Sequence, residues 1–252
     1  MGVYRKRTGV MLDEMTSTEV ESRPLLAVPV GSCEQHGPHL PLGTDTFIAT
    51  ALCQRLVERL AGSGRDVVVA PAVAISASGE HAGFPGTLSI GTEAMATVLV
   101  EMARSADWAS GIVLVNGHGG NHTAVTNAVD VVRSEARRIH VWWPTIPGGD
   151  AHAGRTETSL MLAIHPALVR IERLERGETR PLVAIAAELR AGGVKALSPN
   201  GVLGDPLAAT LGEGIRLLDM LTDDLVASVQ LAIPFAPRSE TGENTTRRQP
   251  AS

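Results

Sequence analysis

Four short runs of apolar residues recur along the chain, and each has the pattern of a strand buried on both faces. The runs are "LLAVPV" from Leu25, "VVVAPAVAI" from Val67, "IVLVNG" from Ile112 and "IHVWW" from Ile139. Apolar residues follow one another in these runs instead of alternating with polar ones, and β-branched residues are frequent, as in the strands of parallel sheets. We therefore predict four buried strands.

The segments between these runs repeat their apolar residues at the spacing of an amphipathic helix. The repeating positions are Phe47, Ile48, Ala51, Leu52, Leu56 and Leu60, then Met95, Val98, Leu99 and Met102, then Val125, Ala128, Val129 and Val132. A further helical pattern runs from Leu207 to about Val229. Strands that alternate with helices predict an α/β fold with a mostly parallel sheet and helices on both faces, and such sheets place their sites beyond the carboxyl ends of the strands.

The chain has the length and composition of one globular domain. It has 252 residues, of which 44% are apolar, and no linker-like tract divides it. Residues 1–22 and 238–252 are mostly polar and without period, so we expect flexible ends on either side of a single domain over residues 23–237.

Charge and cysteine content restrict the partners and the compartment. The net charge of -5 provides no basic surface for nucleic acid or an anionic membrane. No apolar run approaches the roughly 18 residues that span a bilayer, and the first ten residues lack the apolar region of a signal peptide. Two cysteines, Cys33 and Cys53, do not make a disulfide framework. We expect a cytoplasmic protein.

The first cluster of candidate ligands follows the strand predicted from Leu25. In "GSCEQHGPHLPLGTDT", Glu34 and His36 are two residues apart and project to the same side of an extended segment, and Asp45 precedes a helix predicted from about Thr46. Two carboxylates and an imidazole suit Zn, Mn or Fe(II). Two simpler interpretations stay open: Asp45 caps the helix, and the histidines are hydrogen-bonded loop residues.

The second cluster follows the strand predicted from Ile112. In "IVLVNGHGGNH", His118 stands at the end of the strand, and the surrounding glycines allow the backbone to turn sharply and approach a ligand. A phosphate-binding turn is the alternative, but neither of the common glycine-rich phosphate motifs is present.

The third cluster, "GGDAHAGRTETS", contains Asp150, His152 and Glu157 ahead of a short helical run. Glu157 either completes a metal site or stabilises the first turn of that helix. Glu80 and His81 in "SGEHAGFPGTLSIG" are candidates for the wall of a pocket, although a structural turn explains them equally well. One of Trp142 and Trp143 is expected in the core, and the other, Trp143, is expected near the pocket.

Taken together, these motifs and "GVLGDP", in this order over residues 31–206, are similar to those of the creatininase (creatinine amidohydrolase) family. The resemblance implies an α/β fold with a binuclear metal centre that hydrolyses an amide bond, usually in a homohexamer. It also implies that Glu34 and His118 bind one divalent ion, that His36 binds a second, and that Asp45 binds both. His152 resembles the histidine to which proton transfer is assigned.

One departure from the family pattern affects the expected substrate. Creatininase itself has a glutamate ligand two residues after the motif histidine, where this chain has Gly120, and we expect Glu157 to replace it. The motifs are most similar to those of family members that remove a modified C-terminal Val-Tyr dipeptide from a small precursor peptide. Other members act on creatinine or on formamidopyrimidines. The alternative of another class is a non-catalytic module that binds a metal or small molecule. Glu80, His81, Trp143 and Asp150 are the expected substrate contacts.

Overall fold

The computed structural model describes residues 11–20 and 23–234, and at its centre lies a four-stranded sheet. The strands are β1 (Leu25–Val30), β2 (Val67–Val69), β3 (Gly111–Asn116) and β4 (Ile139–Trp142). They pair in the order β2-β1-β3-β4, and every pair is parallel. This confirms the parallel sheet predicted from the apolar runs.

The second strand is shorter than its apolar run. It ends at Val69, and Pro71, which lacks a backbone N–H, follows two residues later. The chain nevertheless stays beside β1, because the amide of Val73 donates to the carbonyl of Pro29 over 2.9 Å. The apolar residues after Pro71 are therefore next to the sheet without continuing the regular strand.

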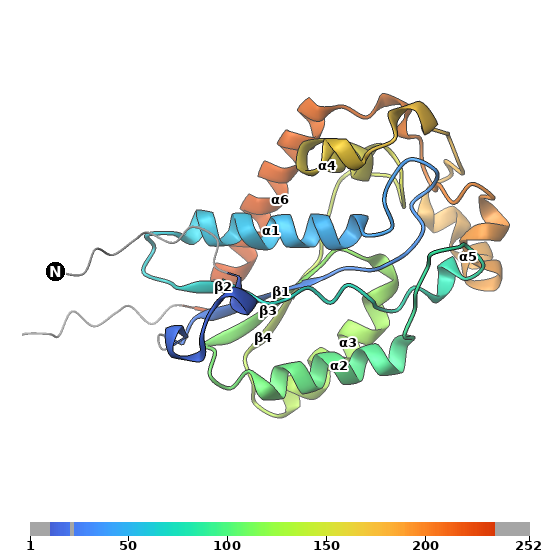
Figure 1. The fold of residues 1–252 in the computed structure, drawn as a ribbon. Helices are drawn as coiled ribbons and strands as arrows, with labels where there is room; N and C mark the ends of the chain where they lie inside the picture. The colour runs from blue at the N-terminus through green and yellow to red at the C-terminus, as the bar shows by residue number, and fades with distance from the viewer. Residues whose placement is uncertain (1–10, 21–22, 235–252) are drawn as a thin grey trace, which may run out of the picture.

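Helices cover both faces of the sheet, as predicted (Figure 1). The helices are α1 (Thr44–Leu60), α2 (Thr92–Ser105), α3 (His122–Ser134), α4 (Arg155–Ile164), α5 (Leu182–Leu197) and α6 (Leu211–Ala232). One face carries α1, α4 and α6, and the other carries α2 and α3 (Figure 1). The sequence reasoning did not predict α5, and it placed the start of α6 at Leu207, where the chain instead makes a short turn over Pro206–Ala208.

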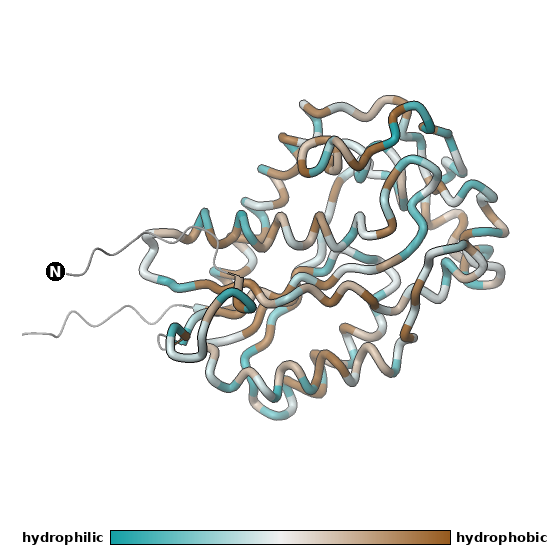
Figure 2. Tube along the Cα trace, in the orientation of Figure 1, coloured by the Kyte–Doolittle hydropathy of each residue, from teal (hydrophilic) through white to brown (hydrophobic). Residues whose placement is uncertain are grey.

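Alternate residues of the strands enter two separate apolar cores. Leu25 and Ala27 of β1 pack on the side of α1 and α6, while Leu26 and Val28 pack on the side of α2 and α3. In Figure 2, apolar positions alternate with polar ones along α1 and α2, as expected of helices with one face on the sheet. Burial on both faces explains why the strands read as continuous apolar runs.

The predicted flexible ends fall largely on residues 1–10, 21–22 and 235–252, which lie outside the described residues. Residues 11–20, which we also expected outside the core, form two short turns over Leu12–Glu14 and Ser17–Glu19, and Met11 pairs with Val69 and packs against the core. Among the described helices, none has the length and apolar character needed to cross a membrane.

Candidate metal centre

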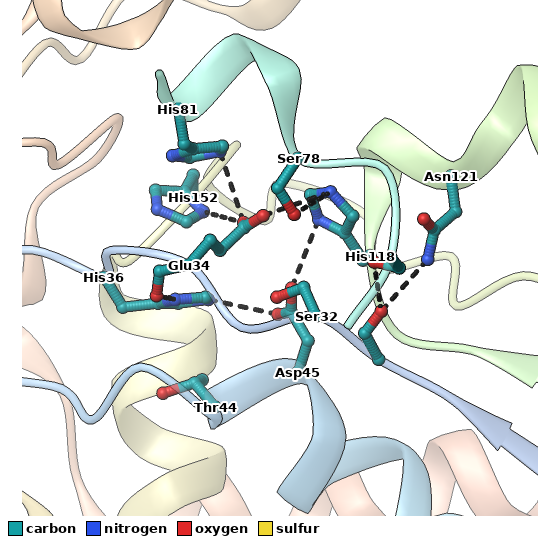
Figure 3. Close-up of polar contacts among 12 residues, drawn as sticks. Ser32, Glu34, His36, Thr44, Asp45, Ser78, His81, His118, Asn121 and His152 are labelled. Carbon is teal, nitrogen blue, oxygen red and sulfur yellow. Dashed lines mark hydrogen bonds and ion pairs between the residues drawn. The ribbon is translucent and has the colours of Figure 1, made fainter. Parts of the chain in front are cut away.

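The candidate site lies beyond the carboxyl ends of the two central strands, on the right in Figure 1. Val30 at the end of β1 is in register with Asn116 at the end of β3, so the segments that follow leave the sheet side by side. Glu34 lies four residues after β1, and His118 lies two residues after β3. Figure 3 shows their side chains directed at each other, with those of Asp45 and His152 close by.

Glu34 is a fully buried carboxylate without a hydrogen bond. Its Oε1 lies 3.2 Å from Nε2 of His81 and its Oε2 lies 3.1 Å from Nε2 of His118, but neither contact has hydrogen-bond geometry. Buried carboxylates are normally hydrogen-bonded, paired with a cation or bound to a metal. A buried carboxylate without a hydrogen bond, facing ring nitrogens, has free oxygen atoms that can bind a cation. The residues around Glu34 therefore fit a metal site.

Asp45 connects the two halves of the site. Its Oδ1 lies 3.0 Å from Nε2 of His36, its Oδ2 lies 3.2 Å from Nδ1 of His118, and Ser32 donates its hydroxyl to Oδ2 over 2.8 Å. Burial alone would raise the pKa of Asp45, but His36 and His118 hold that pKa well below its usual value. The helix begins at Thr44, two residues earlier than expected, so Asp45 lies inside the first turn of α1.

His36 is held in one orientation by its own loop. Its Nδ1 donates to the carbonyl of Glu34 over 3.1 Å, which directs Nε2 toward Asp45. Burial alone would lower the pKa of His36, but the charge of Asp45 and its hydrogen bond outweigh burial and raise the pKa to about 10. For His118, burial also opposes the charged form, yet the surrounding carboxylates of Asp45, Glu34 and Glu80 raise its pKa well above the usual value.

Four groups of side chains among the described residues bring three potential ligand atoms close together. Two of them, Glu34 with His36 and His152 and Glu34 with Glu80 and His81, do not contain Asp45, and the other two share it. Glu34, Asp45 and His118 form one set, and His36, Asp45 and Glu157 form the other; within each set the ligand atoms lie within 4.8 Å of one another. Glu157 reaches this set from the first turn of α4, with its Oε2 3.8 Å from Nε2 of His36. The structure thus brings together all five predicted ligands, and their oxygen and nitrogen donors suit Zn, Mn or Fe(II).

Gly120 is required by the space around it. A Cβ atom at this position would collide with the carboxylate of Glu80, the ring of His118 and the carbonyl of Ala77. A glutamate ligand at position 120 would therefore not fit in this structure, and the carboxylate of Glu80 fills that space from another loop. Nε2 of His118 lies 3.3 Å from Oε1 of Glu80.

His152 lies beside the ligands in the neutral form. Burial, followed by the charges of His36 and His81, lowers its pKa well below the usual value. Its Nε2 donates to the carbonyl of Gln35 over 2.8 Å, so Nδ1 is left as an acceptor, 3.7 Å from Oε1 of Glu34. A neutral imidazole with a free acceptor nitrogen at this point can take up a proton.

Gln35 is a residue of the site that the sequence reasoning missed. Its side-chain amide donates to the carbonyl of Gly201 over 3.0 Å and to Nδ1 of His81 over 2.9 Å. It thereby fixes His81 with the proton on Nε2, the nitrogen nearest Glu34. Its place between Glu34 and His36 was the only available signal in the sequence.

A cavity of about 310 Å³ opens over the ligands. Of the four residues predicted to contact substrate, two line this cavity and two do not. Glu80 and His81 line it. Trp143 and Asp150 are absent from its wall as far as the described residues define it. The ring of Trp143 packs on His122 with 5.1 Å between ring centroids, and Asp150 accepts hydrogen bonds from the amides of residues 155 and 156 at the start of α4.

His39, the remaining histidine of the first cluster, also lies outside the ligand sets. Its Nε2 is 2.9 Å from the hydroxyl of Thr158. Burial lowers the pKa of His39 to about 4, so the ring is neutral. For this residue the simpler interpretation, a hydrogen-bonded loop histidine, describes the structure.

Comparison with known proteins agrees with this geometry. The sequence profile described as creatininase, creatinine amidohydrolase, matches residues 13–229. Two relatives are named mycofactocin precursor peptide peptidase. The one from Mycobacterium tuberculosis is 48% identical over 241 residues, covering 92% of this chain and 96% of that protein. The one from Mycolicibacterium smegmatis is 53% identical over 210 residues, covering 82% and 85%.

Solved structures show the same relationship. A crystal structure of creatinine amidohydrolase (creatininase) superimposes with a TM-score of 0.75 at 25% identity, covering 91% of this chain and 100% of that chain. Sequence motifs, fold and site geometry lead to the same conclusion: this chain belongs to the creatininase family.

Proposed function

We propose that this chain is a metal-dependent peptidase that removes a modified C-terminal Val-Tyr dipeptide from a mycofactocin precursor peptide. The reaction class is supported by Asp45, whose two oxygens face the two sets of ligand atoms beneath an open cavity. The substrate is supported by the names and high identity of the two relatives. We further propose two divalent ions per subunit and a homohexameric assembly, both by analogy with the family.

The proposed assignment of ligands to the two ions follows the two groups of side chains that share Asp45. Glu34 and His118 would hold one ion, His36 and Glu157 would hold the other, and Asp45 would be available to both. When bound, the two divalent ions would lower the pKa of a water molecule and polarise the carbonyl of the scissile amide. The absence of a serine or cysteine nucleophile from the cavity wall, as far as the described residues define it, fits this chemistry.

His152 is the proposed proton carrier. Its Nδ1 is unprotonated and faces the ligands, so it can accept the proton of the attacking water. The same proton is then delivered to the departing amide nitrogen, because an amide nitrogen is a poor leaving group unless it is protonated. Gln35 keeps His152 and His81 in place during the transfer.

A substrate panel tests the proposal. Metal-stripped protein is reloaded with Mn, Zn or Fe(II) and incubated with modified precursor peptide, creatinine and a formamidopyrimidine, and the products are identified by mass spectrometry. We expect release of the dipeptide from the peptide and little turnover of the two small amides. If creatinine or the formamidopyrimidine is hydrolysed faster than the peptide, the peptide is not the preferred substrate. If nothing is hydrolysed with any metal, the chain is better described as a binding module.

Glu34→Gln is the matched inactive control. The substitution keeps the size of a buried side chain and removes one ligand charge, so the fold should survive while the rate falls by at least about 1,000-fold. An undiminished rate in Glu34→Gln would contradict the assigned ligand set.

A further inference from the structure

An apolar surface, most of it from one helix, forms part of the cavity over the candidate ligands. Among the described residues that line the cavity, the leucines and valines are Leu182, Leu189 and Val194 of α5, together with Leu203. Leu182 and Leu189 are about two helical turns apart, so they lie on the same face of α5. We call these four residues the α5 wall. In Figure 1, α5 lies at the same end of the sheet as the candidate site.

The α5 wall is held in place by packing against the turn that carries Glu80. Gly193 has φ +70° and interrupts the helix, and a Cβ atom there would meet the backbone carbonyl of Glu80. Ile185 and Val194 of α5 are buried and pack with Leu203. The apolar surface is therefore presented to the cavity by an anchored helix.

The α5 wall extends from a buried floor to a solvent-exposed rim. Val194 and Leu203 are 1% and 4% exposed, whereas Leu182 is 50% exposed. Because Leu182 borders the cavity, a ligand that enters the cavity can cover its exposed part. Covering apolar surface is favourable in proportion to the area removed from water. The α5 wall is therefore suited to an apolar part of the substrate.

The position of His152 decides which part of the substrate faces the α5 wall. His152 and Leu203 lie opposite each other in an antiparallel bridge, and their amides and carbonyls pair in both directions over 3.2 and 2.9 Å. Residues opposite each other in such a pair project to the same side, and both of these line the cavity. His152 is proposed to protonate the departing amide nitrogen, so that nitrogen must come within hydrogen-bond reach of its ring. The part of the peptide that leaves with this nitrogen therefore begins beside Leu203.

We propose that the α5 wall binds the side chains of the departing dipeptide and thereby fixes the direction of the peptide in the cavity. This inference rests on the proposed peptidase function. The departing residues, Val and Tyr, have largely apolar side chains, which match the leucines and the valine of the wall. A cavity of about 310 Å³ is at the lower end of the range for ligand sites and takes only a short stretch of peptide. The residues before the scissile bond then lie away from the α5 wall.

The test compares Leu182→Ala and Leu189→Ala with wild type on synthetic peptides that carry a C-terminal amide. The peptides share one sequence up to the scissile bond and continue with Val-Tyr or with Ala-Ala. We expect wild type to prefer Val-Tyr, and each variant to lose about 10- to 100-fold in kcat/KM on that peptide, the range for small changes in an apolar pocket. Both variants should cleave the Ala-Ala peptide as wild type does and should bind the same amount of metal.

A second pair of peptides, with Ala or Leu before the scissile bond, tests the direction of the peptide. The choice between these two peptides should be the same in wild type and in both variants, because the α5 wall does not contact that residue. Leu189→Met keeps the volume of the side chain and should retain most of the preference for Val-Tyr. Thermal unfolding of each variant verifies that the fold is retained.

Val183→Ala is the matched control. Val183 is the neighbour of Leu182 on α5 and is 87% exposed, and it is absent from the cavity wall as far as the described residues define it. Val183→Ala should behave as wild type on all four peptides.

The proposal is overturned if the α5 variants slow the Val-Tyr and Ala-Ala peptides by the same factor, or if they change the preference for the residue before the bond. It also fails if Leu182→Ala dissociates an oligomer in size-exclusion chromatography, because a second copy of the chain then covers the wall. If wild type cleaves only the modified precursor peptide, Val-Tyr amide and Ala-Ala amide are compared as competitive inhibitors of that cleavage.

If wild type cleaves no peptide at all, the proposed function fails, and calorimetric binding of the two dipeptide amides to the metal-loaded protein decides the question of the wall. In both assays, a preference for Val-Tyr amide that Leu182→Ala and Leu189→Ala remove supports the α5 wall. Equal binding of the two amides by wild type, or an unchanged preference in the variants, rejects it.

Discussion

The carboxylate of Glu80 occupies the space into which a side chain at position 120 would project. Oε1 of Glu80 also lies 3.3 Å from Nε2 of His118, so the two loops meet at the edge of the ligand cluster. The space around position 120 therefore admits only glycine. Its neighbour Gly119 also lines the cavity, but a Cβ atom at 119 would meet nothing within 4 Å.

The two glycines offer a matched pair of substitutions. Gly120→Ala forces Glu80 or His118 to move, so we expect metal content and kcat/KM to fall by at least about 10-fold, in line with the cost of overpacking a fixed site. Gly119→Ala adds a methyl group where the neighbouring residues leave open space, so it should leave the metal content unchanged. Metal content and kcat/KM are measured on both purified variants. If Gly120→Ala retains as much metal as Gly119→Ala, Glu80 is not fixed in the space beside position 120.

Glu157 is predicted to hold only one of the two proposed ions. It belongs to the set with His36 and is absent from the set with Glu34 and His118. Glu157→Gln should therefore reduce the metal content from two ions per chain to one. Elemental analysis after dialysis measures the ratio, and Glu172→Gln, an exposed substitution outside both sets, is the control. Retention of two ions in Glu157→Gln would move the ligand role to another side chain.

The sequence was most informative where ligands follow directly after strands. Glu34 and His118 come soon after β1 and β3, and the parallel pairing of these strands brings both to one edge. Topology therefore predicts that these two side chains meet, and the structure brings the five residues predicted as ligands together in one cluster. Their roles as ligands remain part of the proposal.

Residues whose position depends on the path of a loop were harder to predict. Trp143 lies one residue beyond β4, where the chain direction changes, and its ring packs on His122 instead of facing the cavity. Helix α5 was missed because Gly192 and Gly193 interrupt its pattern, and only contact with the Glu80 turn explains the kink. Gln35 is held by a hydrogen bond to the carbonyl of Gly201, which is distant in the sequence, so its role could not be predicted from neighbouring residues.

Asp150 is predicted to stabilise the fold and to play no part in substrate binding. Its carboxylate accepts hydrogen bonds from the amides of Arg155 and Thr156 over 2.8 and 2.9 Å, in the manner of a helix cap. Asp150→Ala should lower the free energy of unfolding by about 1–2 kcal/mol. Urea unfolding measures the change, while KM for the peptide should stay the same; a raised KM with unchanged stability would restore the substrate role.

Metal binding is predicted to release protons at neutral pH. In the metal-free protein the pKa of His36 is about 10, because Asp45 outweighs the effect of burial, so the ring carries a proton at pH 7.5. A ligand histidine must be neutral, and metal affinity should therefore increase as pH rises and level off above about pH 10.

Calorimetry in buffers with different ionisation enthalpies measures the released protons. Wild type should release at least one proton per chain from His36 at pH 7.5. Asp45→Asn removes the charge that raises this pKa, although it also removes a proposed ligand, so the comparison uses protons released per ion bound. Heats that do not depend on the buffer would mean that His36 is already neutral before the metal arrives.

His152 is predicted to act on the rate and to leave metal binding intact. Its Nε2 is bonded to the carbonyl of Gln35, and its Nδ1 faces Glu34 without touching it, which is the arrangement of a proton carrier rather than a ligand. His152→Gln should lower kcat by about 100- to 10,000-fold, the usual contribution of general acid–base catalysis, with two ions still bound. The measurement pairs steady-state kinetics with metal analysis on the same sample. Because His152 also lies within ligand distance of Glu34 and His36, loss of an ion together with the rate would identify it as a ligand instead.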